Sequence, residues 1–140
     1  MIIAVDFDGT IVKHEYPKIG KPNLFAFETL KALQKQGHKL ILWTYRAGKE
    51  LDEAVEFCKE HGVEFYAVNK NYPEEELDET ISRKIYADIY IDDRNIGGFP
   101  GWSIIWKLIN ENIPFKSEAF FDIEEEKQES FKDKIIKLFK

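Results

Sequence analysis

The chain has 140 residues, of which 44% are hydrophobic and 33% charged, and its net charge is -6. These values are typical of one globular domain and exclude a disordered chain. A negative chain without a Lys/Arg cluster disfavours binding to nucleic-acid phosphates. We therefore expect no nucleic-acid partner. Because we also find no signal peptide and no apolar stretch of membrane-spanning length, we expect no membrane attachment. The single cysteine, Cys58, implies no disulfide framework, so we expect a reducing, cytoplasmic compartment.

The first predicted element is a strand over Ile2 to Val5, an apolar run typical of a strand buried in a parallel sheet. It is followed directly by Asp-Phe-Asp-Gly-Thr at positions 6–10. Two carboxylates at positions i and i+2 project to one side of an extended chain, and they are costly at the edge of a core unless a cation compensates them. Gly9 permits a sharp turn beside a ligand, and Thr10 adds a hydroxyl. The alternative is a turn that only closes the strand, because Asp-Gly is a common turn dipeptide.

Strands and helices alternate along the rest of the chain. Apolar residues recur at helical spacing in the predicted helices, and continuous apolar runs mark the strands. This alternation predicts an α/β domain with a doubly wound, three-layer parallel sheet. In chain order we expect a loop or short hairpin over 11–21, a helix to about residue 36, a strand over 39–44, a helix over 48–61, a strand over 63–68, a weaker helix over 74–84, a strand over 87–91 and a helix over 102–109.

Each predicted strand ends in polar residues that can take part in chemistry. In open parallel sheets, ligands bind outside the carboxyl ends of the strands, so these residues should share one edge. They are Asp6, Asp8, Thr44, Lys70, Asp92 and Asp93. Turn chemistry alone would favour Asp and Asn but has no need of Thr and Lys. Carboxylates that hold Mg²⁺, beside a hydroxyl and an ammonium group, suit phosphoryl transfer, in which one carboxylate attacks phosphorus and another transfers protons.

The motif DFDGT, followed by strand-Thr and then strand-Asp-Asp, resembles the haloacid dehalogenase (HAD) superfamily of phosphohydrolases over residues 1 to about 112. The resemblance implies that Asp6 is the nucleophile, forming an aspartyl-phosphate, and that Asp8 is the general acid/base. It also implies a Mg²⁺ site made by the side chain of Asp6, the backbone carbonyl of Asp8, and Asp92 with Asp93. Of these last two, we favour Asp93 as the direct ligand.

The resemblance also implies a threonine that hydrogen-bonds the phosphoryl group, which is Thr44, and a lysine. Lys70 leaves the third predicted strand at the edge where the carboxylates lie, and we prefer it. Lys84 resembles the motif lysine in sequence, but it precedes a strand and so belongs at the opposite edge. Further candidate substrate contacts are Gly9, Thr10, Tyr45, Arg46 and Arg94, the alternative for the two arginines being a salt bridge at the rim.

The loop over residues 11–21 is the remaining candidate for selecting a substrate. His14, Tyr16 and Lys18 lie in it and could touch a substrate, although a solvated loop is the alternative. Superfamily enzymes usually select substrates with an inserted cap domain. Here only 36 residues separate Thr10 from Ala47, and a loop, a helix and a strand use them up, so we expect no large cap.

Two functions are compatible with these residues. The first is a Mg²⁺-dependent phosphatase acting on a phosphorylated substrate that the sequence does not identify. The alternative is a non-catalytic HAD-like module that binds phosphorylated ligands or regulates a partner. Asp8 favours the enzyme, because a binding module needs no acid/base. Residues 113–140 should form an extension with an amphipathic helix over 123–139, packed on its own domain or on a second subunit in a homodimer.

Overall fold

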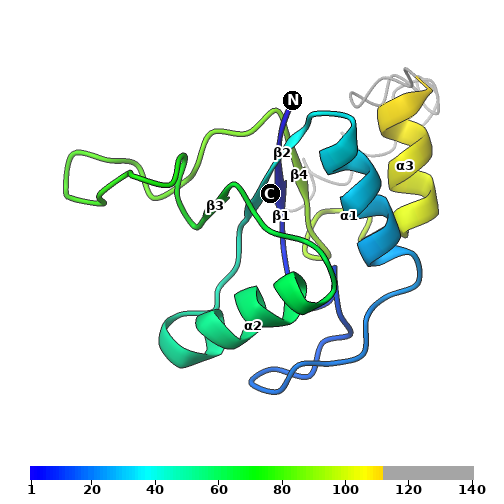
Figure 1. The fold of residues 1–140 in the computed structure, drawn as a ribbon, viewed down its shortest axis with the longest axis horizontal. Helices are drawn as coiled ribbons and strands as arrows, with labels where there is room; N and C mark the ends of the chain where they lie inside the picture. Colours follow the sequence, from blue (N-terminus) through cyan, green and yellow to red (C-terminus); the bar gives the residue numbers. More distant parts are fainter. Residues whose placement is uncertain (112–140) are drawn as a thin grey trace, which may run out of the picture. The chain divides into compact units, whose positions relative to one another are not determined.

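The computed structural model describes residues 1–111 of the chain (Figure 1). The chain divides after Trp106 into two units, and the strands and the candidate site all belong to the first, residues 1–106. The expected extension over 113–140, with its amphipathic helix, lies outside the described residues.

Within the described residues, four parallel strands form a single sheet in the order β3-β2-β1-β4. They are β1 (Ile2–Val5), β2 (Lys39–Leu42), β3 (Ala67–Val68) and β4 (Ile89–Ile91). The α/β class is confirmed, although β3 and β4 are shorter than the apolar runs that predicted them. Strands are added to one side of β1 up to β3, after which the chain crosses back to place β4 on the other side of β1. The β1–β4 boundary is therefore the place where the order reverses, which in parallel sheets is the usual place for a ligand cleft.

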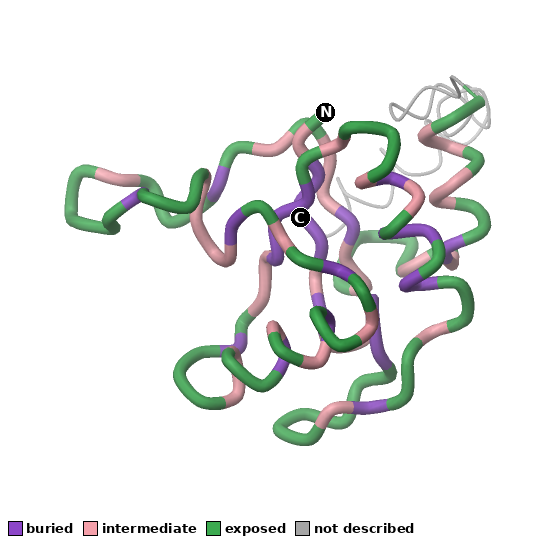
Figure 2. Tube along the Cα trace, in the orientation of Figure 1, coloured by how far each residue is buried: buried purple, intermediate pink, exposed green. Residues whose placement is uncertain are grey.

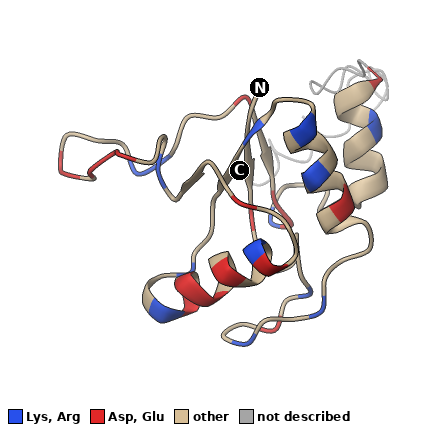
Figure 3. Cartoon of the chain, viewed as in Figure 1, with Lys and Arg blue, Asp and Glu red and all other residues tan. Residues whose placement is uncertain are grey.

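Helices α1 (Ala26–Lys35), α2 (Gly48–Glu60) and α3 (Trp102–Asn110) occupy three of the four helical segments predicted within residues 1–111. The buried side of α1 carries Phe27, whose ring centroid lies 6.0 Å from that of Phe57 on α2. The exposed side of α2 is mainly acidic, and there Lys49 pairs with Glu53 at 3.5 Å (Figure 3). Within residues 1–111, none of the helices has the length and apolar content that crossing a membrane requires.

The core lies on both faces of the sheet, as Figure 2 shows by the buried residues along the strands. Successive strand residues point to opposite faces, so Ile3 and its partner Leu40 share one face while Ala4 and Ile41 share the other. On the second face Ala4 and Ile41 pack with Ile85, which comes from the segment before β4. A non-helical segment therefore helps to cover this face.

The predicted helix over residues 74–84 is wrong. The segment between β3 and β4 forms turns and extends away from the sheet (Figure 1). The Glu75 carboxylate accepts hydrogen bonds from the backbone N–H of Asn71 at 3.0 Å and from its side chain at 2.9 Å, and Asp78 Oδ1 accepts from the N–H of Thr80 at 2.7 Å. These local side-chain acceptors compete with helical carbonyls for the backbone donors, and turns result.

Candidate functional site

The site is assembled where the strands end. The backbone N–H of Asp6 donates to Ile91 O at 2.9 Å, and the N–H of Trp43 donates to Val5 O at 2.8 Å. A third bond of the same kind joins the residue after β3 to the end of β2. The parallel ladder thus continues for one residue beyond β1, β2 and β3. As a result, the polar residues that follow β1, β2 and β4 begin at one edge of the sheet, as the sequence predicts.

Three carboxylates from two strand ends converge at this edge. Asp6, Asp92 and Asp93 each offer an oxygen, and these oxygens lie within 4.8 Å of one another. Burial raises the pKa of Asp6 to about 7; the hydrogen bond that Thr10 Oγ1 donates to Asp6 Oδ2 at 2.9 Å lowers this pKa, whereas the charges of Asp92 and Asp93 raise it. The cluster is therefore electrostatically strained unless a proton or a cation is present.

The turn after Asp6 is tight and brings the chain close to Asp93. Phe7 O accepts hydrogen bonds from three successive N–H groups, those of residues 10–12, at 2.9–3.3 Å. Gly9 has a φ of 90°, and a Cβ placed on it would lie 2.1 Å from Asp93 Oδ2. Only glycine fits here, because another residue would be strained at this φ and its Cβ would collide with Asp93. The Thr10 side chain is fully buried, so its hydroxyl orients Asp6 instead of facing the cleft as a substrate contact.

Arg46 forms a salt bridge, the alternative to a substrate contact, but the side chain is buried and does not lie at the rim. The side chain forms a bidentate ion pair with Asp8: Nε donates to Oδ2 at 2.7 Å and Nη2 donates to Oδ1 at 2.8 Å. The other three N–H bonds go to the carbonyls of Pro17 at 3.0 Å, Lys18 at 2.8 Å and Glu50 at 3.4 Å. The pairing with Asp8 raises the pKa of Arg46 above its usual value. All five guanidinium donors are used, which leaves none for a phosphate in this arrangement.

A cleft of about 700 Å³ opens over the acidic cluster. The residues that line it are Asp6, Asp8, His14, Tyr16, Trp43, Thr44, Tyr45, Asp92, Asp93 and Arg94. The structure therefore brings together most of the predicted site, with two residues of the loop over 11–21. Trp43 is the lining residue that the sequence did not predict, because it lies in an apolar run and was interpreted only as part of a strand. Its position directly before Thr44 was the available signal.

Neither candidate lysine is among the described residues that line the cleft. Lys70 is half-buried and follows Asn69, whose side-chain Oδ1 accepts a hydrogen bond from the N–H of Thr44 at 2.8 Å. Lys84 is exposed, and its Nζ lies 5.3 Å from the ring centroid of Tyr90. Lys70 thus follows a residue that is hydrogen-bonded to Thr44, at the edge of the sheet where the carboxylates lie. The preference for Lys70 over Lys84 stays a prediction.

Fold and site together define an α/β protein with a carboxylate-lined cleft at the carboxyl edge of its parallel sheet. Neither models of known protein families nor curated proteins match the chain. A solved structure of a conserved protein from Bacteroides thetaiotaomicron is similar, with 58% sequence identity and a TM-score of 0.78 over 82% of this chain and 93% of that one. The chain belongs to the same family as this conserved protein.

Proposed function

We propose that the protein is a Mg²⁺-dependent phosphatase of the haloacid dehalogenase type, which hydrolyses phosphoric monoesters through an aspartyl-phosphate on Asp6. The observation that carries this proposal is the convergence of Asp6, Asp92 and Asp93 within 4.8 Å, in a cleft that also holds Asp8 and Thr44. A turn that merely closes a strand does not require three carboxylates from two strands to face one another.

The donor set fits a hard divalent cation. Mg²⁺ prefers oxygen ligands and is usually held by one or two carboxylates together with water and substrate phosphate. Asp92 Oδ1 already accepts a hydrogen bond from the N–H of Arg94 at 2.7 Å, whereas no described residue makes such a bond to the Asp93 carboxylate. This difference favours Asp93 as the direct ligand, with Asp6 and the Asp8 carbonyl. When bound, the cation would polarise a phosphoryl oxygen and offset the charge of the cluster.

Asp6 is the nucleophile in this proposal. Thr10 donates a hydrogen bond to Oδ2 of the Asp6 carboxylate and so fixes the orientation of this group. The other carboxylate oxygen of Asp6 is available to attack phosphorus. A bond forms between that oxygen and phosphorus as the ester bond to the leaving oxygen breaks. Water then attacks the aspartyl-phosphate and regenerates the carboxylate. Thr44, at the end of β2, supplies a hydroxyl to the phosphoryl group.

Asp8 transfers the protons in both steps, and its ion pair with Arg46 influences both transfers. In the second step Asp8, which is paired with Arg46, accepts a proton from the attacking water. In the first step Asp8 must give a proton to the leaving oxygen, and for this at least one of its oxygens has to separate from Arg46. The ion pair is therefore part of the catalytic cycle as well as of the fold.

The remaining features of the proposal follow from the sequence as a whole. They are a doubly wound three-layer architecture without a large cap, a cytoplasmic location, and a homodimer as a possible assembly. The short interval between Thr10 and Ala47 supports the absence of a cap, because α1 and β2 account for 14 of its 36 residues and the loop over residues 11–21 for another 11. Substrate selection then depends on the loop over residues 11–21 and on the residues beside Thr44.

The test is hydrolysis of a simple aryl phosphate with Mg²⁺ and with EDTA. We expect Mg²⁺-dependent release of phosphate that Asp6→Asn abolishes and that Asp8→Asn lowers by at least about 100-fold. Asp52→Asn, on the exposed side of α2, is the matched control and should leave the rate unchanged. If a broad panel of phosphate esters gives no turnover while inorganic phosphate still binds, the non-catalytic binding module is the better description.

A further inference from the structure

Aromatic side chains form one wall of the cleft. Tyr16, Trp43 and Tyr45 all line it, and we call these three residues the aromatic rim. Tyr45 is 93% exposed and Tyr16 is 45% exposed. Their rings meet edge to face, with centroids 6.4 Å apart and planes at 68°. Two tyrosines that remain open to solvent in a cleft lined by carboxylates offer apolar ring surface to a ligand, and most of it belongs to Tyr45.

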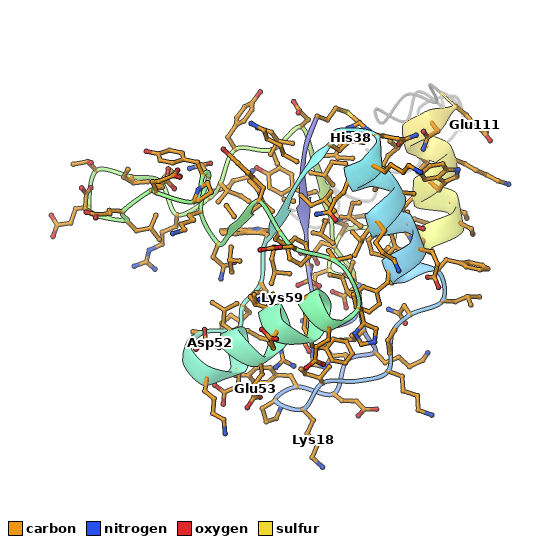
Figure 4. All side chains as sticks on the ribbon, in the orientation of Figure 1. Lys18, His38, Asp52, Glu53, Lys59 and Glu111 are labelled. Carbon is orange, nitrogen blue, oxygen red and sulfur yellow. The ribbon has the colours of Figure 1, made fainter. Side chains whose placement is uncertain are left out.

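The aromatic rim is held in place by the surrounding contacts. The Arg46 guanidinium carbon lies 5.2 Å from the centroid of the Tyr16 ring, and the same side chain binds the carbonyls of Pro17 and Lys18. Lys18 itself points away from the fold (Figure 4), so the loop presents His14 and Tyr16 to the cleft instead of its lysines. After the end of β2, Tyr45 directly follows Thr44, whose N–H donates to Oδ1 of Asn69, the residue after β3. These contacts fix the position of Tyr16 and of the backbone beside Tyr45.

The charges in the cleft limit which ligands the aromatic rim can bind. One phosphate has Mg²⁺ and Thr44 as partners in the proposed site, but Arg46 has no free donor, and Arg94 is the only cationic side chain among the described lining residues. A second anionic group would therefore lie near Asp92 and Asp93, with Arg94 as its only lysine or arginine partner among these lining residues. A neutral, planar group attached to a single phosphate meets no such penalty. A volume of about 700 Å³ is enough for a ligand of this size.

We propose that the aromatic rim binds a nucleobase, so that the substrates of this site are nucleoside monophosphates, with the base stacked against Tyr45 and the phosphate at Asp6. This inference rests on the proposed phosphatase function. Stacking of a base on an aromatic side chain corresponds to roughly a 10- to 100-fold gain in affinity.

The experiment compares a nucleoside 5'-monophosphate with ribose 5-phosphate, which carries the same phosphate and sugar without the base. We expect kcat/KM to be at least about 10-fold higher for the nucleotide. Tyr45→Ala should lower kcat/KM for the nucleotide about 10-fold more than for ribose 5-phosphate. Tyr86→Ala is the matched control, because Tyr86 is 71% exposed and does not line the cleft, and it should change neither value.

A binding measurement keeps this inference separate from the proposed function. Calorimetric titration of Asp6→Asn with the nucleotide, ribose 5-phosphate and phosphotyrosine needs no turnover. Tighter binding of the nucleotide than of both other ligands, lost in the double variant with Tyr45→Ala, supports the nucleobase site even if no ester is hydrolysed. Equal binding of nucleotide and ribose 5-phosphate overturns it, and tighter binding of phosphotyrosine overturns the assignment to nucleotides. Absence of Mg²⁺-dependent turnover, by contrast, overturns the phosphatase.

Discussion

Replacing Asp6 by Asn should stabilise the metal-free protein at alkaline pH while abolishing catalysis. Burial, with the charges of Asp92 and Asp93, raises the pKa of Asp6 from its ordinary value of 3.8 to about 7 in the folded protein. Each pKa unit corresponds to about 1.36 kcal/mol, so ionising Asp6 in the fold costs about 4 kcal/mol once the pH exceeds 7. Asn has nearly the same shape and no charge, and it can still accept the hydrogen bond from Thr10.

The direction of this pH effect on stability follows from which state, folded or unfolded, binds the proton of Asp6. Between pH 4 and pH 7 the unfolded chain has lost this proton while the folded protein keeps it, so the contribution of Asp6 to stability falls as the pH rises and levels off above pH 7. Between pH 5 and pH 8, the advantage of Asp6→Asn over the wild type should therefore grow by roughly 2–3 kcal/mol. Its largest value, at pH 8, should be about 2–4 kcal/mol.

Urea unfolding in EDTA at pH 5 and pH 8 measures this difference, with the exposed Asp52→Asn as the control for loss of one charge. Addition of Mg²⁺ at pH 8 should stabilise the wild type and have little effect on Asp6→Asn, because binding to the folded state alone shifts the equilibrium. A stability difference that does not change with pH, or a loss of stability in Asp6→Asn at pH 8, would refute the electrostatic account of the cluster.

Three further predictions concern other parts of the site and the core. Gly9→Ala should weaken Mg²⁺ binding at least about 10-fold in calorimetric titration, because its Cβ would displace Asp93; an unchanged affinity would contradict the close approach. Arg46→Lys should lower the free energy of unfolding in urea by roughly 2–3 kcal/mol, since lysine cannot reproduce the fork on Asp8, and equal stability would count against that contact. Cys58, whose thiol pKa burial raises to about 12, should react with a thiol reagent at pH 8 only on unfolding, so rapid labelling of the native protein would disagree.

Much of the fold was predictable from the sequence because local rules are strong for this topology. Continuous apolar runs predict β1 and β2, and helical spacing predicts α1, α2 and α3. Once the strands are parallel, their carboxyl ends share one edge, so residues that follow different strands meet without any knowledge of their contacts. Asp6, Thr44 and the Asp92–Asp93 pair could therefore be placed in one cleft from their positions in the chain.

Tertiary structure decided the features that depend on contacts between distant residues. Arg46 and Asp8 are 38 positions apart, and nothing in the sequence distinguishes an arginine that reaches a phosphate from one whose five donors are taken by the protein. The segment over residues 74–84 carries a weak helical pattern, yet local hydrogen bonds to Glu75 and Asp78 turn it into a loop. A hydrophobic period identifies which face of an element is apolar. The partner of each polar group is set only when the chain folds and brings donors within reach of acceptors.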